Sequence, residues 1–286
     1  MNAAIYDERV CALGEGPLWH PERGQLFWFD ILARRLMSRM GDTPLDWEWD
    51  EHVSAAGWID RETLMVAGAT GLWRFDIGTG ARERLAPLEA DDPGTRSNDG
   101  RADPQGGFWI GTMGLNAEAG RGAIHRYCRG EVREIVGGIT IPNAICFAPG
   151  GAHAYYTDTA EAVIWRQPLD PDGWPAGDRA EFCDFSGVGL APDGAVCDAA
   201  GDLWIAQWGA WRVACHGPDG RFKSALDLGS AHTTCPAFGG PDLRRMFVTS
   251  AMQGLPDGAL HHRPGGGRTW VADMPVAGQA EHRVRV

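Results

Sequence analysis

Short apolar and aromatic runs alternate along this chain with clusters of glycine, proline, aspartate and asparagine, and helical periodicity is rare. The most regular of these runs begin at Leu26, Leu64, Phe108, Tyr155, Leu203 and Met246. Their spacing of roughly 40 to 50 residues is that of a propeller blade made of four strands. The pattern therefore predicts an all-β fold, a six-bladed β-propeller with four-stranded blades, in one domain over residues 1–286.

The segments that flank each run are expected to complete its blade. A strand before the run, such as residues 16–20, is predicted to line the central channel. A further strand follows each run, and residues 259–263 supply it in the last blade. The strands that come next, such as residues 82–85, are more polar, which suits an exposed outer edge.

Closure of the ring removes the free edge between the first and last blades. Residues 5–13 precede the first inner strand, and we expect this N-terminal strand to close the last blade beside a strand near residues 269–272. Two long loops, residues 90–96 and 114–122, are the main candidates for covering the mouth of the channel.

One polar position recurs in four blades, five residues before the turn that ends the inner strand. It holds Glu15, Asn98, Asn143 and Asp193, while the other two blades place Ala55 and Cys235 there. Equivalent positions in a closed ring of repeats face the same axis, so these four side chains should converge. Carboxylate and carboxamide oxygens are the ligands that Ca²⁺, Mg²⁺ and Mn²⁺ prefer. The repeat therefore predicts a divalent cation held on one side of the channel.

Turn chemistry is the alternative explanation for these residues, because Asp-Gly and Asn-Asp-Gly are common turn sequences. Turn chemistry does not readily explain why four blades carry an oxygen-bearing side chain at the same position of the repeat. Glu15 precedes Gly-Pro, where glutamate is a poor turn residue, and a buried carboxylate there needs a cation. Arg96 faces the same side as Asn98 in an extended segment, where it either holds a substrate oxygen or is a solvated loop residue.

For several histidines and tryptophans we predict structural roles. His20 is expected to cap a loop, and His232 could reach the channel although a structural role is preferred. His261 and His262 point to opposite faces of a strand and do not form a chelating pair. The tryptophans that recur in equivalent strands are predicted to fill the core between blades; they are Trp28, Trp109 and Trp204.

Composition narrows the class of protein and its location. The net charge of −12 argues against nucleic acid and anionic membrane surfaces as partners. Seven scattered cysteines without a C-x-x-C argue against disulfides and a zinc–thiolate site, and favour buried thiols. No secretory signal and no run of about 18 apolar residues is present, so we expect a cytoplasmic protein. We also expect a monomer or weak homo-oligomer.

Several motifs resemble the SMP-30 (regucalcin)/gluconolactonase family over almost the whole chain, in the same order. They are Leu13-Gly-Glu15-Gly-Pro-Leu-Trp-His, Arg96-Ser-Asn98-Asp-Gly, Phe108-Trp-Ile-Gly-Thr-Met113, Ile141-Pro-Asn143, Tyr156-Thr-Asp158-Thr, Pro192-Asp193-Gly and Phe238-Gly-Gly-Pro-Asp-Leu. Together with the last of these, the form Ala206-Gln-Trp208-Gly looks closest to bacterial sugar (aldono)lactonases.

The resemblance implies a six-bladed propeller with one divalent cation in its channel, which could be Ca²⁺, Mg²⁺, Mn²⁺, Zn²⁺ or Fe²⁺. It implies Glu15, Asn143 and Asp193 as metal ligands, with Asp193 also the catalytic base. It implies Arg96 and Asn98 as substrate contacts. The repeat alone would make Asn98 a metal ligand, and here we follow the family, which places it nearer the substrate.

The resemblance also implies a reaction, the hydrolytic opening of gluconolactone, xylonolactone or arabinonolactone to an aldonic acid. Animal members have a glutamate shortly after Gly-Thr-Met, where this chain has Gly114-Leu115-Asn116, so the preferred sugar does not carry over. Two alternatives stay open. One is a metal-dependent hydrolase of aryl esters or organophosphates on the same fold, and the other is a non-catalytic propeller that binds a partner.

Overall fold

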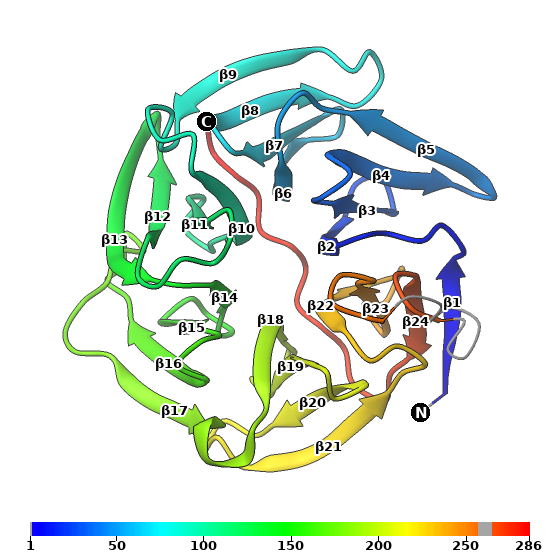
Figure 1. Cartoon of the computed structure of the whole chain (residues 1–286), viewed down its shortest axis with the longest axis vertical. Helices are drawn as coiled ribbons and strands as arrows, with labels where there is room; N and C mark the ends of the chain where they lie inside the picture. The colour runs from blue at the N-terminus through cyan, green and yellow to red at the C-terminus, as the bar shows by residue number, and fades with distance from the viewer. Residues whose placement is uncertain (1, 257–264) are drawn as a thin grey trace.

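Six antiparallel four-stranded sheets stand as blades around a central channel in the computed structural model, which describes residues 2–256 and 265–286 (Figure 1). The first blade, from the channel outward, is β2 (Gly14–His20), β3 (Gln25–Asp30), β4 (Arg35–Met40) and β5 (Thr43–Glu48). The second is β6 (Val53–Asp60), β7 (Thr63–Gly68), β8 (Gly71–Asp76) and β9 (Arg82–Pro87). The third is β10 (Thr95–Ala102), β11 (Phe108–Gly114), β12 (Gly122–Cys128) and β13 (Glu131–Ile139).

The other three blades follow the same order in space. The fourth is β14 (Pro142–Phe147), β15 (His153–Asp158), β16 (Val163–Pro168) and β17 (Ala180–Asp184). A short 3₁₀ turn, η1 (Ser186–Val188), leads into the fifth, which is β18 (Ala191–Cys197), β19 (Leu203–Trp208), β20 (Arg212–His216) and β21 (Phe222–Asp227). The sixth is β22 (Thr233–Gly239), β23 (Arg245–Ser250), β24 (Thr269–Asp273) and β1 (Ala3–Asp7).

The ring closes through the N-terminal strand, which confirms the prediction. β1 pairs antiparallel with β24, with Ile5 opposite Trp270, so the last blade takes its outermost strand from the start of the chain. Within this blade β24 pairs directly with β23, with Val271 opposite Phe247. The strand expected over residues 259–263, with His261 and His262, lies outside the described residues.

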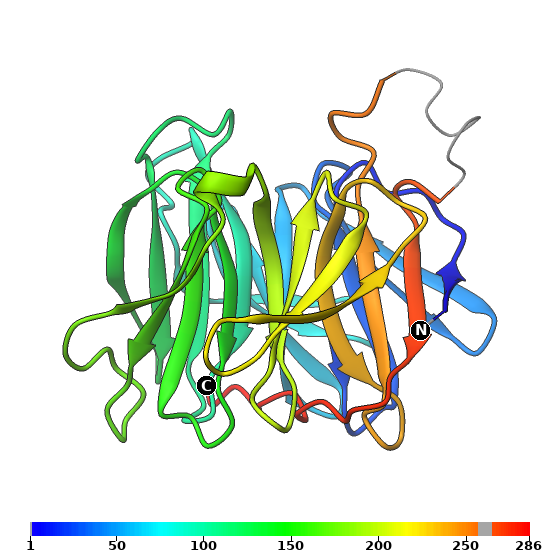
Figure 2. The same cartoon turned by 90° about the horizontal axis from the view of Figure 1, so that it is seen from below.

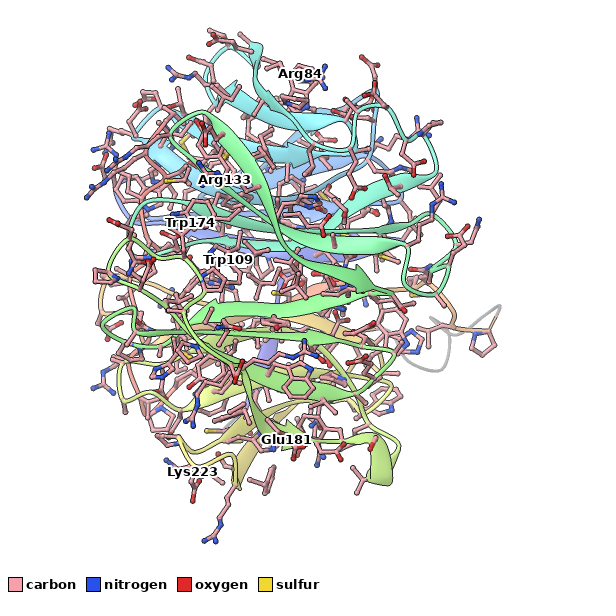
Figure 3. All side chains as sticks on the ribbon, turned by 90° about the vertical axis from the view of Figure 1, so that its left-hand side faces the viewer. Arg84, Trp109, Arg133, Trp174, Glu181 and Lys223 are labelled. Carbon is pink, nitrogen blue, oxygen red and sulfur yellow. The ribbon has the colours of Figure 1, made fainter. Side chains whose placement is uncertain are left out.

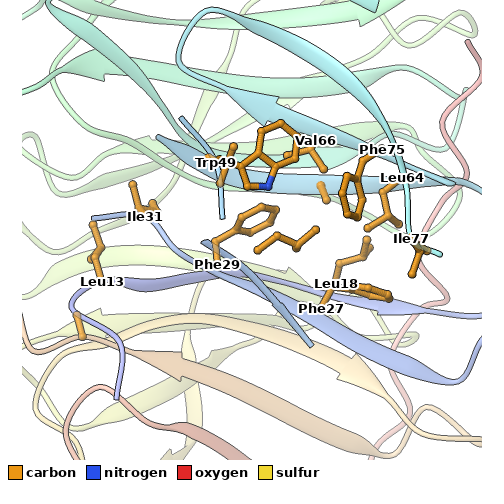
Figure 4. Packing of buried hydrophobic residues seen from close by; sticks show 14 residues of the cluster. Leu13, Leu18, Phe27, Phe29, Ile31, Trp49, Leu64, Val66, Phe75 and Ile77 are labelled. Atoms are coloured by element: carbon orange, nitrogen blue, oxygen red, sulfur yellow. The ribbon is translucent and has the colours of Figure 1, made fainter. Parts of the chain in front are cut away.

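Apolar side chains fill the spaces between neighbouring blades. In the cluster between the first two blades, Phe29 of β3 lies among Trp49, Val66 and Phe75 (Figure 4). The recurrent tryptophans are buried as predicted; they are Trp28, Trp109 and Trp204. Such packing follows from strands that are buried on both faces, and it holds the inner strands in fixed positions around the channel.

Outer strands such as β9, β17 and β21 are polar and exposed, as expected, whereas β1 is largely apolar. Arg133, Glu181 and Lys223 project from the rim of the ring, whereas Trp109 lies inside it (Figure 3). All seven cysteines are free thiols and five of them are buried, in agreement with the sequence analysis. In the described part of the chain, no helix has the length and apolar character that a membrane crossing requires.

An extended C-terminal tail, which the sequence analysis missed, follows β24. It crosses the ring on one side, seen across the centre in Figure 1 and along the bottom in Figure 2. Backbone hydrogen bonds join Gly278 to the sixth blade at 2.8 Å and Val284 to the second at 2.9 Å. The amide of Gln279 donates to a carbonyl of the fourth blade at 3.1 Å, and Glu281 forms a buried ion pair with Arg101 of β10. The tail therefore ties distant blades together.

Candidate active site

Each inner strand carries a β-bulge close to the channel mouth. Relative to the second strand, the register shifts by one residue between Glu15 and Leu18, Val53 and Ala55, Ser97 and Gly100, Asn143 and Cys146, Pro192 and Ala195, and Thr233 and Pro236. A bulge adds one residue to a strand and re-aims the side chains around it. Four of the six bulges occur where the sequence places an acidic or amide side chain. The recurring bulge in the backbone therefore coincides with the recurring polar position in the sequence.

Two glycines allow the strands to approach each other at these bulges. Gly16, directly after Glu15, has φ +52°, and a Cβ there would lie 2.1 Å from the backbone oxygen of Ser54 in the second blade. A Cβ on Gly194 would lie 2.4 Å from the Sγ atom of Cys235 in the sixth. These positions exclude any side chain, which explains the glycine that follows both predicted carboxylates.

A pocket of about 650 Å³ opens at the channel end where the inner strands begin, whereas the C-terminal tail bonds to residues near their other ends. It is lined by all of the predicted site residues, which are Glu15, Arg96, Asn98, Asn143 and Asp193. All five side chains are buried, at 3–8 % exposed. The residues at the equivalent position of the other two blades, Ala55 and Cys235, do not line it. The structure thus brings together side chains from four separate blades.

A chain of hydrogen bonds orients the amide groups in this pocket. Arg96 Nη1 donates to Asn98 Oδ1 at 2.8 Å, and Asn98 Nδ2 donates to Asn143 Oδ1 at 3.0 Å. Asn143 Nδ2 in turn donates to Thr159 Oγ1 at 2.8 Å, and the Thr159 hydroxyl donates to the carbonyl of Pro192 at 2.8 Å. Because that hydroxyl has a single hydrogen, it accepts from Asn143 and fixes which way the amide is turned.

Thr159 was missed by the sequence analysis as a site residue, although it ends the motif Tyr156-Thr-Asp158-Thr. It follows β15 directly and lines the same pocket. The signal that could have found it is its place immediately after the strand beside Asn143. Asn98, which the repeat alone would make a metal ligand, has hydrogen-bond partners on both sides. Its oxygen faces the guanidinium of Arg96, and its amino group donates to Asn143, so it orients a neighbouring donor.

Acidic side chains outnumber basic ones in the pocket. Burial raises the pKa of Glu15, and the nearby carboxylate of Asp99 raises it further. Burial also holds the pKa of Asp193 well above its usual range, with added repulsion from Glu15 and then Asp99. Arg96 is the only positively charged side chain lining the described part of the pocket, and burial lowers its pKa to about 10. Buried carboxylates with so little compensation are costly unless a cation joins them.

Asp99 is a second residue that the sequence analysis missed. Its carboxylate accepts a hydrogen bond from the backbone of Ile145 at 2.7 Å, and burial raises its pKa to about 6. It lies on the inner strand next to Asn98 and does not line the pocket. Its charge is felt by both Glu15 and Asp193, so it adds to the negative field below the pocket.

The donor set fits a hard divalent cation better than a transition metal held by nitrogen or sulfur. Glu15 and Asp193 offer carboxylate oxygens, and Asn143 offers an amide oxygen whose orientation is fixed. Among the described residues, no group of three or more His, Cys, Asp or Glu side chains is arranged to hold a metal. The set proposed here, Glu15, Asn143 and Asp193, is not a group of that kind, because its third donor is an amide. Oxygen donors of this kind suit Ca²⁺, Mg²⁺ and Mn²⁺.

Loops from opposite sides of the ring form the walls of the pocket. Leu115, Asn116 and Ala117, from the loop after β11, line one side, as the sequence analysis expected. Trp208 and Gln253 line another part, from the fifth and sixth blades. The prediction for residues 90–96 holds only in part. Arg96 lines the pocket, but residues 90–92 border a separate depression of about 1010 Å³ between the second and third blades.

Two histidines have structural contacts. His20 lies at the end of β2 with its ring fully buried, and Nε2 is 3.0 Å from the carbonyl of Asp60 in the second blade. It therefore links two blades, and its own carbonyl accepts a hydrogen bond from Gly24 at 2.9 Å in the turn after β2. His232 stacks on Trp208, with ring centroids 4.0 Å apart and planes inclined by 15°. It does not line the channel pocket itself.

Comparison with known proteins agrees with this arrangement of motifs. Residues 13–252 match the family described as the SMP-30/Gluconolactonase/LRE-like region. The chain belongs to this family. Two of its relatives are the 6-deoxy-6-sulfogluconolactonase of Pseudomonas putida and the L-arabinolactonase of Azospirillum brasilense. Each is 34% identical, and the alignments cover 94% of both chains for the former and 99% of this chain and 95% of the relative for the latter.

A solved structure of a family member has nearly the same fold. It is the crystal structure of a calcium-binding protein, regucalcin, from Agrobacterium tumefaciens strain C58. The two chains share 38% identity and a TM-score of 0.97, over 100% of this chain and 98% of the other. The SMP-30/gluconolactonase fold thus accounts for the whole of this chain, which confirms the family and the propeller that the sequence predicts.

Proposed function

We propose that this member of the SMP-30/gluconolactonase family hydrolyses sugar lactones of the gluconolactone, xylonolactone or arabinonolactone type to aldonic acids. One observation supports this most strongly. Two buried carboxylates and one oriented amide oxygen, from three blades, line a pocket that also holds an arginine and a second asparagine. Relatives with 34% identity over nearly the whole chain bear the names of sugar lactonases, which supports the class of substrate.

In this proposal Glu15, Asn143 and Asp193 bind one divalent cation. When bound, the cation supplies Lewis acidity at the lactone carbonyl and charge stabilisation for the oxyanion that forms there. The oxygen donors favour Ca²⁺, Mg²⁺ or Mn²⁺ over Zn²⁺ or Fe²⁺. The calcium-binding name of the structural relative is consistent with a hard cation.

The side chains of the protein carry the proton and hold the substrate. Asp193 accepts a proton from the water that attacks the carbonyl carbon, and this proton passes to the ring oxygen as the ester bond breaks. Arg96 and Asn98 hold the hydroxyl groups or the carbonyl of the sugar. Arg96 is already held by the backbone of Ser97 and by Asn98, so its guanidinium needs little reordering when the substrate binds. We retain the expectations of a cytoplasmic location and a monomer or weak homo-oligomer.

The test is a substrate panel with controlled metal. Chelator-treated protein is assayed on gluconolactone, xylonolactone and arabinonolactone, and on phenyl acetate and paraoxon, with and without added Ca²⁺, Mg²⁺ or Mn²⁺. We expect lactone opening that requires the cation and falls by at least about 100-fold in Asp193→Asn. An exposed aspartate gives the matched control, Asp219→Asn, which should match the wild type.

Two results would overturn the proposal. Turnover of phenyl acetate or paraoxon without turnover of any sugar lactone would favour the alternative hydrolase. Full activity on sugar lactones after chelation would remove the cation from the mechanism. A non-catalytic propeller remains the third class, and the convergence of buried acidic side chains disfavours it, since a binding face has no need of them.

A further inference from the structure

Trp208 differs from the tryptophans that fill the core. It ends β19 at the mouth of the channel, it is only partly buried, and it lines the same pocket as Glu15 and Asp193. The buried tryptophans of equivalent strands, by contrast, lie between blades. A partly buried tryptophan in such a pocket presents a large, rigid apolar surface to whatever binds there.

His232 holds this indole in place from behind. The two rings are almost parallel, with centroids 4.0 Å apart, so the imidazole covers one face of the indole. The Nδ1 atom of His232 lies 2.8 Å from the carbonyl of Gln253, and a carbonyl can only accept, so Nδ1 carries the hydrogen. The backbone of Ala251 also donates to the carbonyl of His232 at 2.9 Å. The indole also packs against the apolar cluster that includes Leu13, and the part of it that lines the pocket is open to a ligand, whereas His232 does not line the pocket.

Polar side chains stand on other parts of the pocket wall, where a sugar would present its hydroxyl groups. Gln253 lines the pocket on the same side as Trp208. Asn116 lines it from the third blade, and the carboxylate of Glu118 accepts from both its backbone and its side-chain amide at 3.1 Å. A sugar lactone has a hydroxylated edge and a face made of C–H bonds. These two surfaces of the sugar match a pocket in which Trp208 offers an aromatic surface and Gln253 and Asn116 offer amide groups elsewhere on the wall.

We infer that Trp208, held by His232, is the surface on which the ring of a sugar lactone stacks through its C–H face. Stacking favours closed, hydroxylated rings over open-chain esters with the same acyl group. It also brings the ring carbonyl into the pocket that the acidic side chains line. The inference rests on the proposed function for its substrate class. It adds a specificity-determining residue, Trp208, and a positioning residue, His232.

The experiment measures binding and hydrolysis separately. Glucono-δ-lactam, a ring of the same shape that resists hydrolysis, is titrated into the protein by calorimetry, and open-chain gluconamide is titrated in parallel. Trp208→Ala should weaken lactam binding by about tenfold or more and leave gluconamide binding within about threefold. Trp208→Phe, which keeps an aromatic face, should retain most of the lactam affinity. Thermal unfolding of each variant verifies that the fold persists.

Kinetics on gluconolactone tests the role of His232. His232→Ala should raise KM while kcat stays within about threefold, because His232 touches the indole and not the substrate. His232→Phe restores a stacked ring and should restore KM. A residue with a merely structural role would lower stability without this separation of KM from kcat.

The outcomes distinguish this inference from the proposed function. Equal losses for lactam and gluconamide in Trp208→Ala, or no loss for either, overturn the stacking. A wild-type protein that does not bind the lactam overturns it as well. A wild-type protein that binds the lactam through Trp208 but opens no sugar lactone overturns the proposed function and supports the stacking. Hydrolysis of gluconolactone that is unchanged in Trp208→Ala overturns the stacking alone.

Discussion

Replacement of Thr159 by valine tests the hydrogen-bond chain that orients Asn143. Valine keeps the shape of threonine but cannot accept from Asn143 Nδ2, and it cannot donate to the carbonyl of Pro192. Asn143 is only 3 % exposed, so water does not readily replace the lost partner. A buried donor without a partner costs about 1–3 kcal/mol, and rotation of the amide would turn its NH₂ group toward the site. The oxygen would then no longer be available to a cation.

The expected loss of metal affinity follows from the position of Thr159, which contacts a proposed metal ligand and would not touch the cation itself. Loss of a group that orients a ligand lowers metal affinity by about 10–100-fold, which equals about 1.4–2.7 kcal/mol. We expect this loss for Thr159→Val, measured by calorimetric titration of Mn²⁺ into chelator-treated protein. Thr159→Ser keeps the hydroxyl and is the matched control, with an affinity near that of the wild type. Wild-type Mn²⁺ affinity in Thr159→Val would refute the orientation argument.

Three further predictions concern stability, each measured by urea unfolding. Gly16→Ala should lower the free energy of unfolding by about 1–3 kcal/mol more than Gly24→Ala, because both have positive φ but only the new Cβ at Gly16 meets backbone, at 2.1 Å. Glu281→Gln should cost about 3–5 kcal/mol, because it leaves the buried Arg101 without its counter-charge. Burial lowers the pKa of His20, so the unfolded chain binds a proton that the fold resists. The stability this residue provides is therefore complete above pH about 6.5 and falls as the pH drops below it.

Each of these has a control and a contrary result. Similar losses in the two glycine variants would mean that the approach of the first two blades is not tight. Asp273→Asn removes one partner of an exposed ion pair and should change nothing measurable, so an equally small effect for Glu281→Gln would contradict the tail as a structural tie. His20→Gln cannot titrate, and it should reduce the loss of stability between pH 7 and pH 5, to which other buried histidines also contribute. An unchanged pH profile would exclude His20 as its source.

The repeat made the ring and the convergence of site residues predictable from the sequence. Strand-forming runs of similar spacing identify the blades, and a fixed distance from the turn identifies positions that face one axis. Glu15, Asn98, Asn143 and Asp193 were found in that way, and the structure places them in one pocket. The resemblance to a family then separated Asn98 from the other three, and its hydrogen bonds to Arg96 and Asn143 are compatible with that distinction.

Contacts between blades were not predictable, because the repeat describes one blade at a time. Thr159 acts on Asn143 from the end of the next strand, and its hydroxyl reaches the carbonyl of Pro192 in another blade. His20 looked like a turn residue because its partner, the carbonyl of Asp60, belongs to a different repeat. The C-terminal tail has no alternating pattern. It is held by backbone hydrogen bonds and by single side chains such as Glu281, none of which leaves a periodic signal.

The most direct test is a crystal structure of the protein soaked in Mn²⁺, with anomalous diffraction to locate the ion. If oxygens from three blades form one cation site, a single strong peak will lie in the channel pocket. That peak will be about 2.0–2.6 Å from oxygen atoms of Glu15, Asn143 and Asp193. A pocket without a peak, or a peak that contacts only one of these three side chains, would contradict the claim that the ring of repeats builds a metal site.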